Sequence, residues 1–281
     1  MYELFKTLFI LSLFGSCLTV LLFILKPITA KRLSAKWQYA AWIAVLVLMI
    51  VPFYKCIPKS RAKEMPFVPQ TAAVTMSQQT QEGGAQQNNA EFTAPIEYKE
   101  VTVLPTKVRL RLTDLAAYIW APGAMAFLLT LFISYLIFLN RKKKNSTAVS
   151  DGEILKSVKK ELGIKRNIPI RMADDVSSPM LIGVLFPCVY IPSQTVSDDK
   201  MRMILRHELT HYKRGDLVIK WFAALVNAIH WFNPLCYLAC KNLSEACEIS
   251  CDMAVTQNMS EEEQKVYMQT ILELAERKEQ G

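Results

Sequence analysis

Apolar segments of membrane-spanning length constrain this chain more than any other feature of its sequence. The first runs from Leu4 to Leu25, a second and shorter one from Trp37 to Tyr54, and a third from Leu115 to Leu139. A helix of about 20 apolar residues, rising about 1.5 Å per residue, crosses the roughly 30 Å hydrocarbon layer of a bilayer. In a chain of 281 residues with 52% hydrophobic content, these runs predict three transmembrane helices.

Basic residues beside the apolar runs predict their orientation. Arg141 to Lys144 follow the third run, and Lys31, Arg32 and Lys36 lie between the first two. Cytoplasmic loops carry an excess of Lys and Arg, so we expect both segments in the cytoplasm and the N-terminus outside. Because the basic residues cluster beside hydrophobic runs, the net charge of +8 does not indicate nucleic-acid binding. The prediction is a multi-pass protein of the cell membrane.

Composition divides the chain into four parts. Residues 1–54 hold two predicted transmembrane helices and a basic loop, residues 55–114 an external loop, residues 115–140 the third helix, and residues 145–281 a cytoplasmic domain. The Gln-rich external loop has too few apolar residues to offset the entropy cost of ordering. Two roles stay open for it, ligand sensing and a plain tether between helices. Only one of the seven cysteines falls there, so no disulfide framework is predicted.

The cytoplasmic domain is predicted to mix helices and strands. A helix is expected over residues 151–162 with Gly163 as its C-cap, and short strands over residues 168–172 and 187–192. Acidic residues after a serine favour another helix over residues 197–212. The fold class is therefore a mainly α membrane protein with a small α+β cytoplasmic domain.

A metal-binding motif lies on the second of these predicted helices. His207, Glu208 and His211 match the pattern H-E-x-x-H. On a helix, this spacing puts both imidazoles on one face, where they can share one Zn²⁺, while the glutamate can act as general base toward the attacking water. The sequence therefore predicts a zinc site with Glu208 as the catalytic residue. The alternative is that both histidines are exposed to solvent on a surface helix and bind no metal.

A catalytic zinc site usually has three protein ligands, and His230 and Glu248 are the candidates for the third. His230 lies in an apolar segment, where a histidine is more often a core residue bonded to backbone. Glu248 precedes Asp252 by one helical turn, so one carboxylate can bind zinc while Asp252 holds a ligand histidine by a hydrogen bond. We therefore predict His207, His211 and Glu248 as the zinc ligands.

The apolar stretch from Leu217 to Ala239 is long enough for a fourth span. A single crossing would put His211 and Glu248 on opposite sides of the membrane, where they could not share one ion. The break at Asn233-Pro234 instead predicts a helical hairpin over residues 216–257, packed in the domain or dipping into the cytoplasmic leaflet.

Three stretches together resemble a known family. They are HELTHYKRGD at His207–Asp216, HWFNPL at His230–Leu235 and EISCD at Glu248–Asp252. They resemble the integral-membrane metallopeptidases of the BlaR and MecR type, which act as β-lactam sensors and antirepressors. The resemblance implies a cytoplasmic peptidase domain of the gluzincin type whose signal leads to loss of a transcriptional repressor. The antibiotic receptors of this type also carry a final span and an external penicillin-binding domain. We expect neither here, and hence no direct β-lactam sensing.

These features combine into one functional prediction, a membrane-embedded zinc-dependent endopeptidase that cleaves a cytoplasmic regulator such as a transcriptional repressor. The expected partners are the lipid bilayer and this protein substrate, with a second copy of the chain or a separate sensor protein left open. The alternative is a non-catalytic signalling scaffold in which zinc holds the domain together. Glu208 argues against the scaffold, because a structural site needs no base and usually closes with a fourth ligand.

Overall fold

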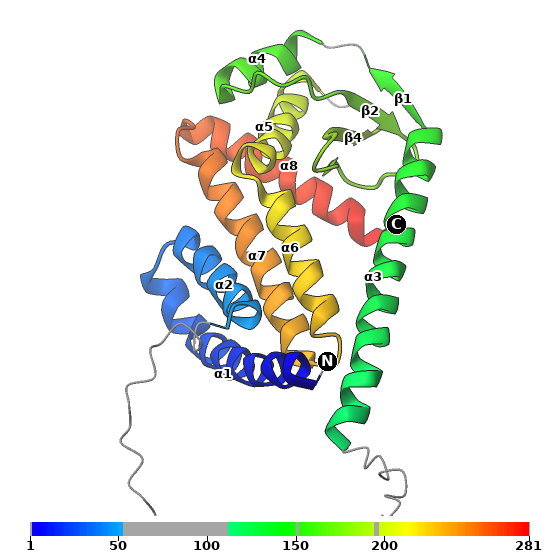
Figure 1. The fold of residues 1–281 in the computed structure, drawn as a ribbon. Coiled ribbons are helices and arrows are strands. Elements are labelled where there is room, and N and C mark those ends of the chain that lie inside the picture. The colour runs from blue at the N-terminus through cyan, green and yellow to red at the C-terminus, as the bar shows by residue number, and fades with distance from the viewer. Residues whose placement is uncertain (1, 53–111, 150–151, 194–196, 281) are drawn as a thin grey trace, which may run out of the picture.

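The structure, a computed structural model, describes residues 2–52, 112–149, 152–193 and 197–280. The predicted external loop therefore lies almost entirely outside the described residues. In chain order the elements are α1 (Tyr2–Arg32), α2 (Ala35–Ile50), α3 (Leu112–Lys144), β1 (Ser146–Val149), α4 (Glu153–Leu162), β2 (Ile170–Ala173), β3 (Met180–Ile182), β4 (Cys188–Pro192), α5 (Asp198–Arg214), α6 (Asp216–Ile229), α7 (Pro234–Thr256) and α8 (Glu261–Gln280) (Figure 1).

Two of the described helices are long and apolar enough to cross a membrane, within Glu3–Thr29 of α1 and Leu115–Lys144 of α3. The second predicted span, Trp37 to Tyr54, is shorter than expected, because α2 has only 16 residues and ends at Ile50 instead of reaching Tyr54. Pro52 gives the physical reason, since a proline disfavours helical backbone at the residue before it. Three membrane-crossing helices are therefore not confirmed.

A four-stranded sheet caps one end of the helices, with the order β1-β2-β4-β3. β2 and β4 are the two strands that the sequence predicted, and they pair in parallel. β1 and β3 were missed by the sequence analysis, and each adds antiparallel to one edge. The sheet packs against α4 and α5 through a core that includes Leu155, Val158, Ile191, Leu205 and Leu209.

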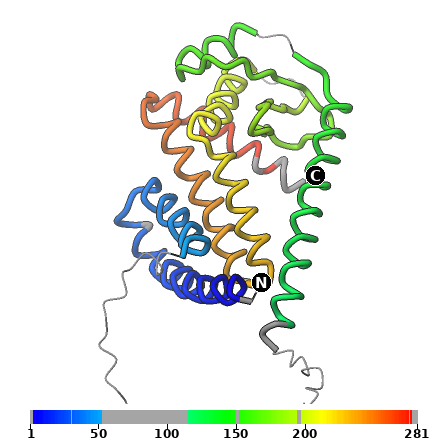
Figure 2. Tube along the Cα trace, viewed as in Figure 1, coloured from blue at the N-terminus to red at the C-terminus, as the bar shows by residue number. Residues whose placement is uncertain are grey.

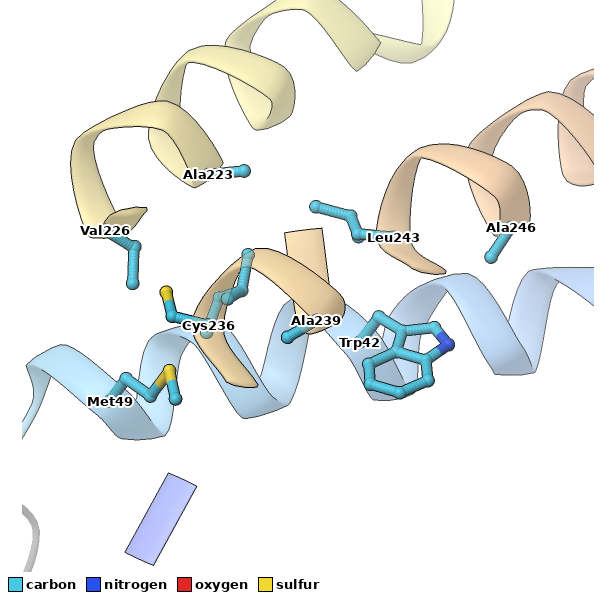
Figure 3. Packing of buried hydrophobic residues seen from close by; sticks show 9 residues of the cluster. Trp42, Met49, Ala223, Val226, Cys236, Ala239, Leu243 and Ala246 are labelled. Carbon is cyan, nitrogen blue, oxygen red and sulfur yellow. The ribbon is translucent and has the colours of Figure 1, made fainter. Parts of the chain in front are cut away.

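The α6–α7 hairpin occupies the centre of the molecule. The two helices run side by side between α1 and α2 on one side and α3 on the other, as the ribbon and the Cα trace both show (Figures 1 and 2). Asn233 caps α7 by accepting a hydrogen bond from the Leu235 amide, and Pro234 is the first helical residue, as the sequence predicted. Small residues of α7, Cys236 and Ala239, let α2 approach closely through Trp42 and Met49 (Figure 3).

Polar anchors hold the hairpin tip against α1 and α2. The buried Asn233 amide donates to the hydroxyls of Ser12 at 2.7 Å and Ser16 at 2.8 Å. His230 donates from Nε2 to the Met49 carbonyl at 3.2 Å. Since a buried polar group without a partner is costly, these bonds fix where the hairpin turns. His230 is therefore a core residue bonded to backbone.

The same tip also contacts the first part of α3. Trp120 donates from its indole nitrogen to the Ile229 carbonyl at 2.8 Å. A Cβ on Gly123 would lie 2.6 Å from Cζ2 of Trp231, so only glycine permits this approach. The hairpin thus extends alongside the apolar helices, with its tip held by the first half of α1, the end of α2 and the first half of α3.

Candidate metal centre

Helix α5 presents the H-E-x-x-H motif toward α7. Ser197 is its N-cap residue, and Gly215 ends it in a left-handed conformation with φ of 73°. The four-residue spacing brings the rings of His207 and His211 to a centroid separation of 4.7 Å. Because Gly215 turns the chain at once into α6, Asp216 lies beside His211.

The three predicted zinc ligands converge on one point. The Nε2 atoms of His207 and His211 are 3.1 Å apart, and Oε2 of Glu248 is 3.2 Å from the His211 nitrogen and 3.7 Å from the His207 nitrogen. Donor atoms at about 2.1 Å from a tetrahedral zinc ion lie roughly 3.4 Å from one another. The separations therefore fit three protein ligands around one such ion.

His211 is oriented by Asp216, which the sequence analysis quoted but gave no role. His211 Nδ1 lies 2.7 Å from Oδ2 of Asp216, whose side chain is 1% exposed. Arg214 Nε approaches the same oxygen at 3.2 Å, and the Tyr39 hydroxyl donates to Oδ1 at 3.0 Å. The buried carboxylate accepts the Nδ1 proton, which leaves Nε2 of His211 free to bind a cation.

His207 is oriented through Tyr267 and Asp252. The Tyr267 hydroxyl donates to Oδ1 of Asp252 at 2.6 Å and lies 2.7 Å from His207 Nδ1. Asp252 itself lies 3.3 Å from Nδ1. Because Tyr267 donates its proton to Asp252, its oxygen accepts a hydrogen bond from Nδ1 of His207. The structure thus places Asp252 and Tyr267, a tyrosine from α8, beside the candidate ligand His207.

The electrostatics of the cluster favour positive charge at its centre. With both Nδ1 atoms donating, two imidazole lone pairs and a carboxylate face one another, and a bound proton or a shared metal cation satisfies them. Burial alone would lower the pKa of His207, but hydrogen bonds to Asp252 and Glu248 outweigh it and raise the pKa to about 10. Burial alone would raise the pKa of Glu248, but hydrogen bonds from His207 and His211 hold it well below its ordinary value. The residues present therefore fit a divalent metal ion.

Glu208 lies at the same site and binds none of these groups. Its side chain is buried, and among the residues that the structure describes its carboxylate has no hydrogen-bond partner. Burial raises its pKa, against the opposing charges of His207 and His211. The carboxyl group lines a cleft of about 550 Å³ whose walls also include Ser178, Pro179, Ile204, His207, Ser244, Glu245, Glu248, Asp252, Ile271 and Leu274.

Two thiols also lie near the histidines. Cys251 is buried with its sulfur 3.8 Å from the His207 carbonyl, and Cys247 is buried next to His211 and Asp216. Cys236, one of four cysteines on α7, packs against α2 in the apolar core. Cys251 thus lies close to both histidines of the motif, and Cys247 close to His211 and Asp216.

Some residues of the site carried no usable sequence signal. Tyr39 and Tyr267 reach it from α2 and α8, which are remote in sequence. Lys220, which donates to Oε1 of Glu248 at 2.9 Å, lies inside an apolar stretch where no motif marks it. Asp216 could have been found, because a carboxylate just after a helix-ending glycine lies near the last turn of that helix.

Comparisons with known proteins show what the chain as a whole is similar to. A family model described as BlaR1 peptidase M56 matches residues 6–281. The chain is 31% identical to the regulatory protein BlaR1 of Bacillus licheniformis over 159 residues, which cover 55% of this chain and 26% of that protein. It is 24% identical to the methicillin resistance mecR1 protein of Staphylococcus aureus over 273 residues, covering 93% of this chain and 45% of that protein. The chain thus spans less than half the length of either relative.

Proposed function

Because the chain belongs to the BlaR1 peptidase M56 family, a family of membrane signalling proteases, we propose that it is a zinc-dependent endopeptidase that cleaves a cytoplasmic regulator such as a transcriptional repressor. One observation carries the proposal. His207, His211 and Glu248 direct three acceptor atoms at one point, while the carboxylate of Glu208, which has no part in that contact, lines the same cleft. A free carboxylate beside an open metal position is the arrangement that peptide hydrolysis requires.

Glu208 carries the proton transfers in the proposed reaction. A zinc ion bound by the three ligands would polarise the scissile carbonyl and lower the pKa of the attacking water. Glu208 accepts the proton of that water and then donates it to the leaving amine. Burial raises its pKa above the ordinary value of a carboxyl group, which is the direction that favours a group acting as both base and acid. Asp216, Asp252 and Tyr267 hold the histidine ligands in one orientation throughout.

The edge of the sheet supports a protein substrate in extended conformation. β3 is the last strand in the sheet order, and Ser178 and Pro179, just before it, line the cleft with His207 and Glu208. An edge strand offers unpaired backbone groups to which an extended peptide can add. A segment bound along Met180–Ile182 would therefore pass beside Glu208, which favours cleavage within a chain.

The charges at this end of the molecule support a cytoplasmic site. The basic last turns of α1 and α3 lie toward the sheet and the metal centre (Figure 1). Lys26 pairs with Glu245 on α7 at 2.7 Å, and Lys142 pairs with Asp175 at 3.0 Å. Since basic helix ends stay in the cytoplasm, we place the peptidase part there, in contact with soluble regulators. A second copy of the chain or a separate sensor protein fits the same placement.

The decisive experiment replaces Glu208 with glutamine in the full chain. The amide keeps the shape of the side chain but cannot accept a proton, so Glu208→Gln should bind zinc like the wild type. Proteolysis should fall by about 10²- to 10⁴-fold. Comparing proteomes of cells that carry either form would identify the substrate as a protein that accumulates intact in the variant.

The control is a zinc-free sample of the wild-type protein. If Glu208→Gln leaves cleavage and signalling intact while zinc removal abolishes signalling, the metal is structural and the chain is a scaffold. If both forms process the same proteins at equal rates, the peptidase proposal is wrong.

A further inference from the structure

A hydrogen-bond chain joins the apolar helix α2 to the metal centre. The Tyr39 hydroxyl donates to Oδ1 of Asp216 at 3.0 Å, and Oδ2 of Asp216 lies 2.7 Å from Nδ1 of His211. We propose that Tyr39 is a positioning residue of the metal centre, which fixes the carboxylate that in turn fixes the His211 imidazole. This inference rests on the metal site proposed above and goes beyond it, because it assigns a role to a residue of the membrane-associated part.

The two oxygens of Asp216 have different partners. Oδ2 faces His211 and Arg214, whereas Oδ1 has the Tyr39 hydroxyl as its hydrogen-bond partner among the residues that the structure describes. Asp216 is fully buried, so water cannot replace a lost donor. Without the Tyr39 hydroxyl, rotation toward Arg214 lowers the energy of the Asp216 carboxylate. The His211 imidazole that it holds then turns with it. Orientation of a metal ligand by such a partner typically changes metal affinity about 10- to 100-fold.

The surroundings of Tyr39 keep its hydroxyl in place. The Arg214 guanidinium lies over its ring at 5.4 Å from the centroid. One turn further along, Trp42 and then Leu46 are buried against α6 and α7. Tyr39 therefore moves only with α2 as a whole. A shift or rotation of α2 relative to α6 would reach His211 through one carboxylate, which couples the metal centre to the packing of the apolar helices.

Tyr39→Phe is the variant that isolates this role. It keeps the ring and its contact with Arg214 and removes only the hydroxyl. Zinc affinity of the purified full chain is measured by competition with a chelator, and the visible spectrum of the Co²⁺-substituted protein reports ligand geometry. We expect Tyr39→Phe to weaken zinc binding by about 10-fold, the lower end of the usual range, and to shift the Co²⁺ absorption bands. Tyr237→Phe is the matched control, because that hydroxyl donates to the Trp231 carbonyl at the other end of the hairpin.

A double variant tests whether Tyr39 acts through Asp216. In an Asp216→Ala background, Tyr39→Phe should change zinc affinity by less than about twofold, because the carboxylate that it positions is gone. Wild-type affinity and spectrum in Tyr39→Phe would overturn the proposal, as would an equal loss of affinity in both backgrounds. Absence of zinc binding by the wild type would instead overturn the metal centre. Loss of proteolysis in Glu208→Gln with unchanged zinc affinity tests the peptidase proposal separately.

Discussion

At the scale of single residues, the two candidate third ligands have opposite surroundings. Glu248 turns a carboxylate oxygen toward both histidines of the motif. His230 is fully buried at the far end of the hairpin and is bonded to a backbone carbonyl. The geometry thus makes Glu248 the ligand candidate and His230 a core histidine. From the sequence alone, Glu248 could only be favoured over His230.

Removal of each side chain should therefore have a different effect on zinc content. We expect Glu248→Ala to lose most bound zinc, because two imidazoles alone leave the ion with half of its usual ligands. His230→Ala should keep close to one zinc per chain, although it should unfold at a lower temperature. Metal analysis of the purified proteins measures both. Full zinc content in Glu248→Ala would remove that residue from the ligand set.

At the scale of elements, the sequence predicted best those helices whose ends carry a signal in neighbouring residues. The starts of α5 and α7 were predicted because Ser197 and the Asn233-Pro234 pair carry their capping signals within a few residues. Strands β1 and β3 were missed because they have only four and three residues, too few to show a clear alternation of apolar and polar side chains. Tyr39 could not be assigned to the site, since 177 residues separate it from Asp216.

The close packing of α3 against the hairpin tip gives a prediction about stability. Gly123→Leu places a side chain where the Trp231 ring lies, so the contact between α3 and the tip must open. Overpacking of this kind typically costs about 1–3 kcal/mol. Thermal unfolding of the full chain in detergent should show a clear decrease in midpoint.

At the scale of the whole molecule, the sheet and metal centre lie at one end and the hairpin tip at the other (Figure 1). The hairpin leaves α5 and returns to α8, so both of its ends lie at the site. The basic last turns of α1 and α3 lie toward that end as well. Because the hairpin begins and ends at the same end of the molecule, candidate ligands that precede and follow the long apolar stretch can lie side by side.

This arrangement predicts which positions share a side of the membrane. Cysteines introduced at the exposed positions Lys213 and Asn258 should both react with a membrane-impermeant reagent only from the cytoplasm. A cysteine at Ala90, in the predicted external loop, should react from outside. The background for all three would carry serine at Cys17 and Cys56. Labelling of positions 213 and 258 from opposite sides would mean that the hairpin crosses the bilayer and that the proposed metal site cannot form.

The position of the hairpin between the ligands has a consequence for how the protein is made. His211 leaves the ribosome 37 residues before Glu248, and the segment between them must first turn at Asn233 against Ser12. Until that turn is anchored, Glu248 is not held beside the two imidazoles. If these residues form the proposed zinc site, a newly made chain would bind its metal only after the apolar helices have packed. The proposed peptidase would stay inert during synthesis for the same reason.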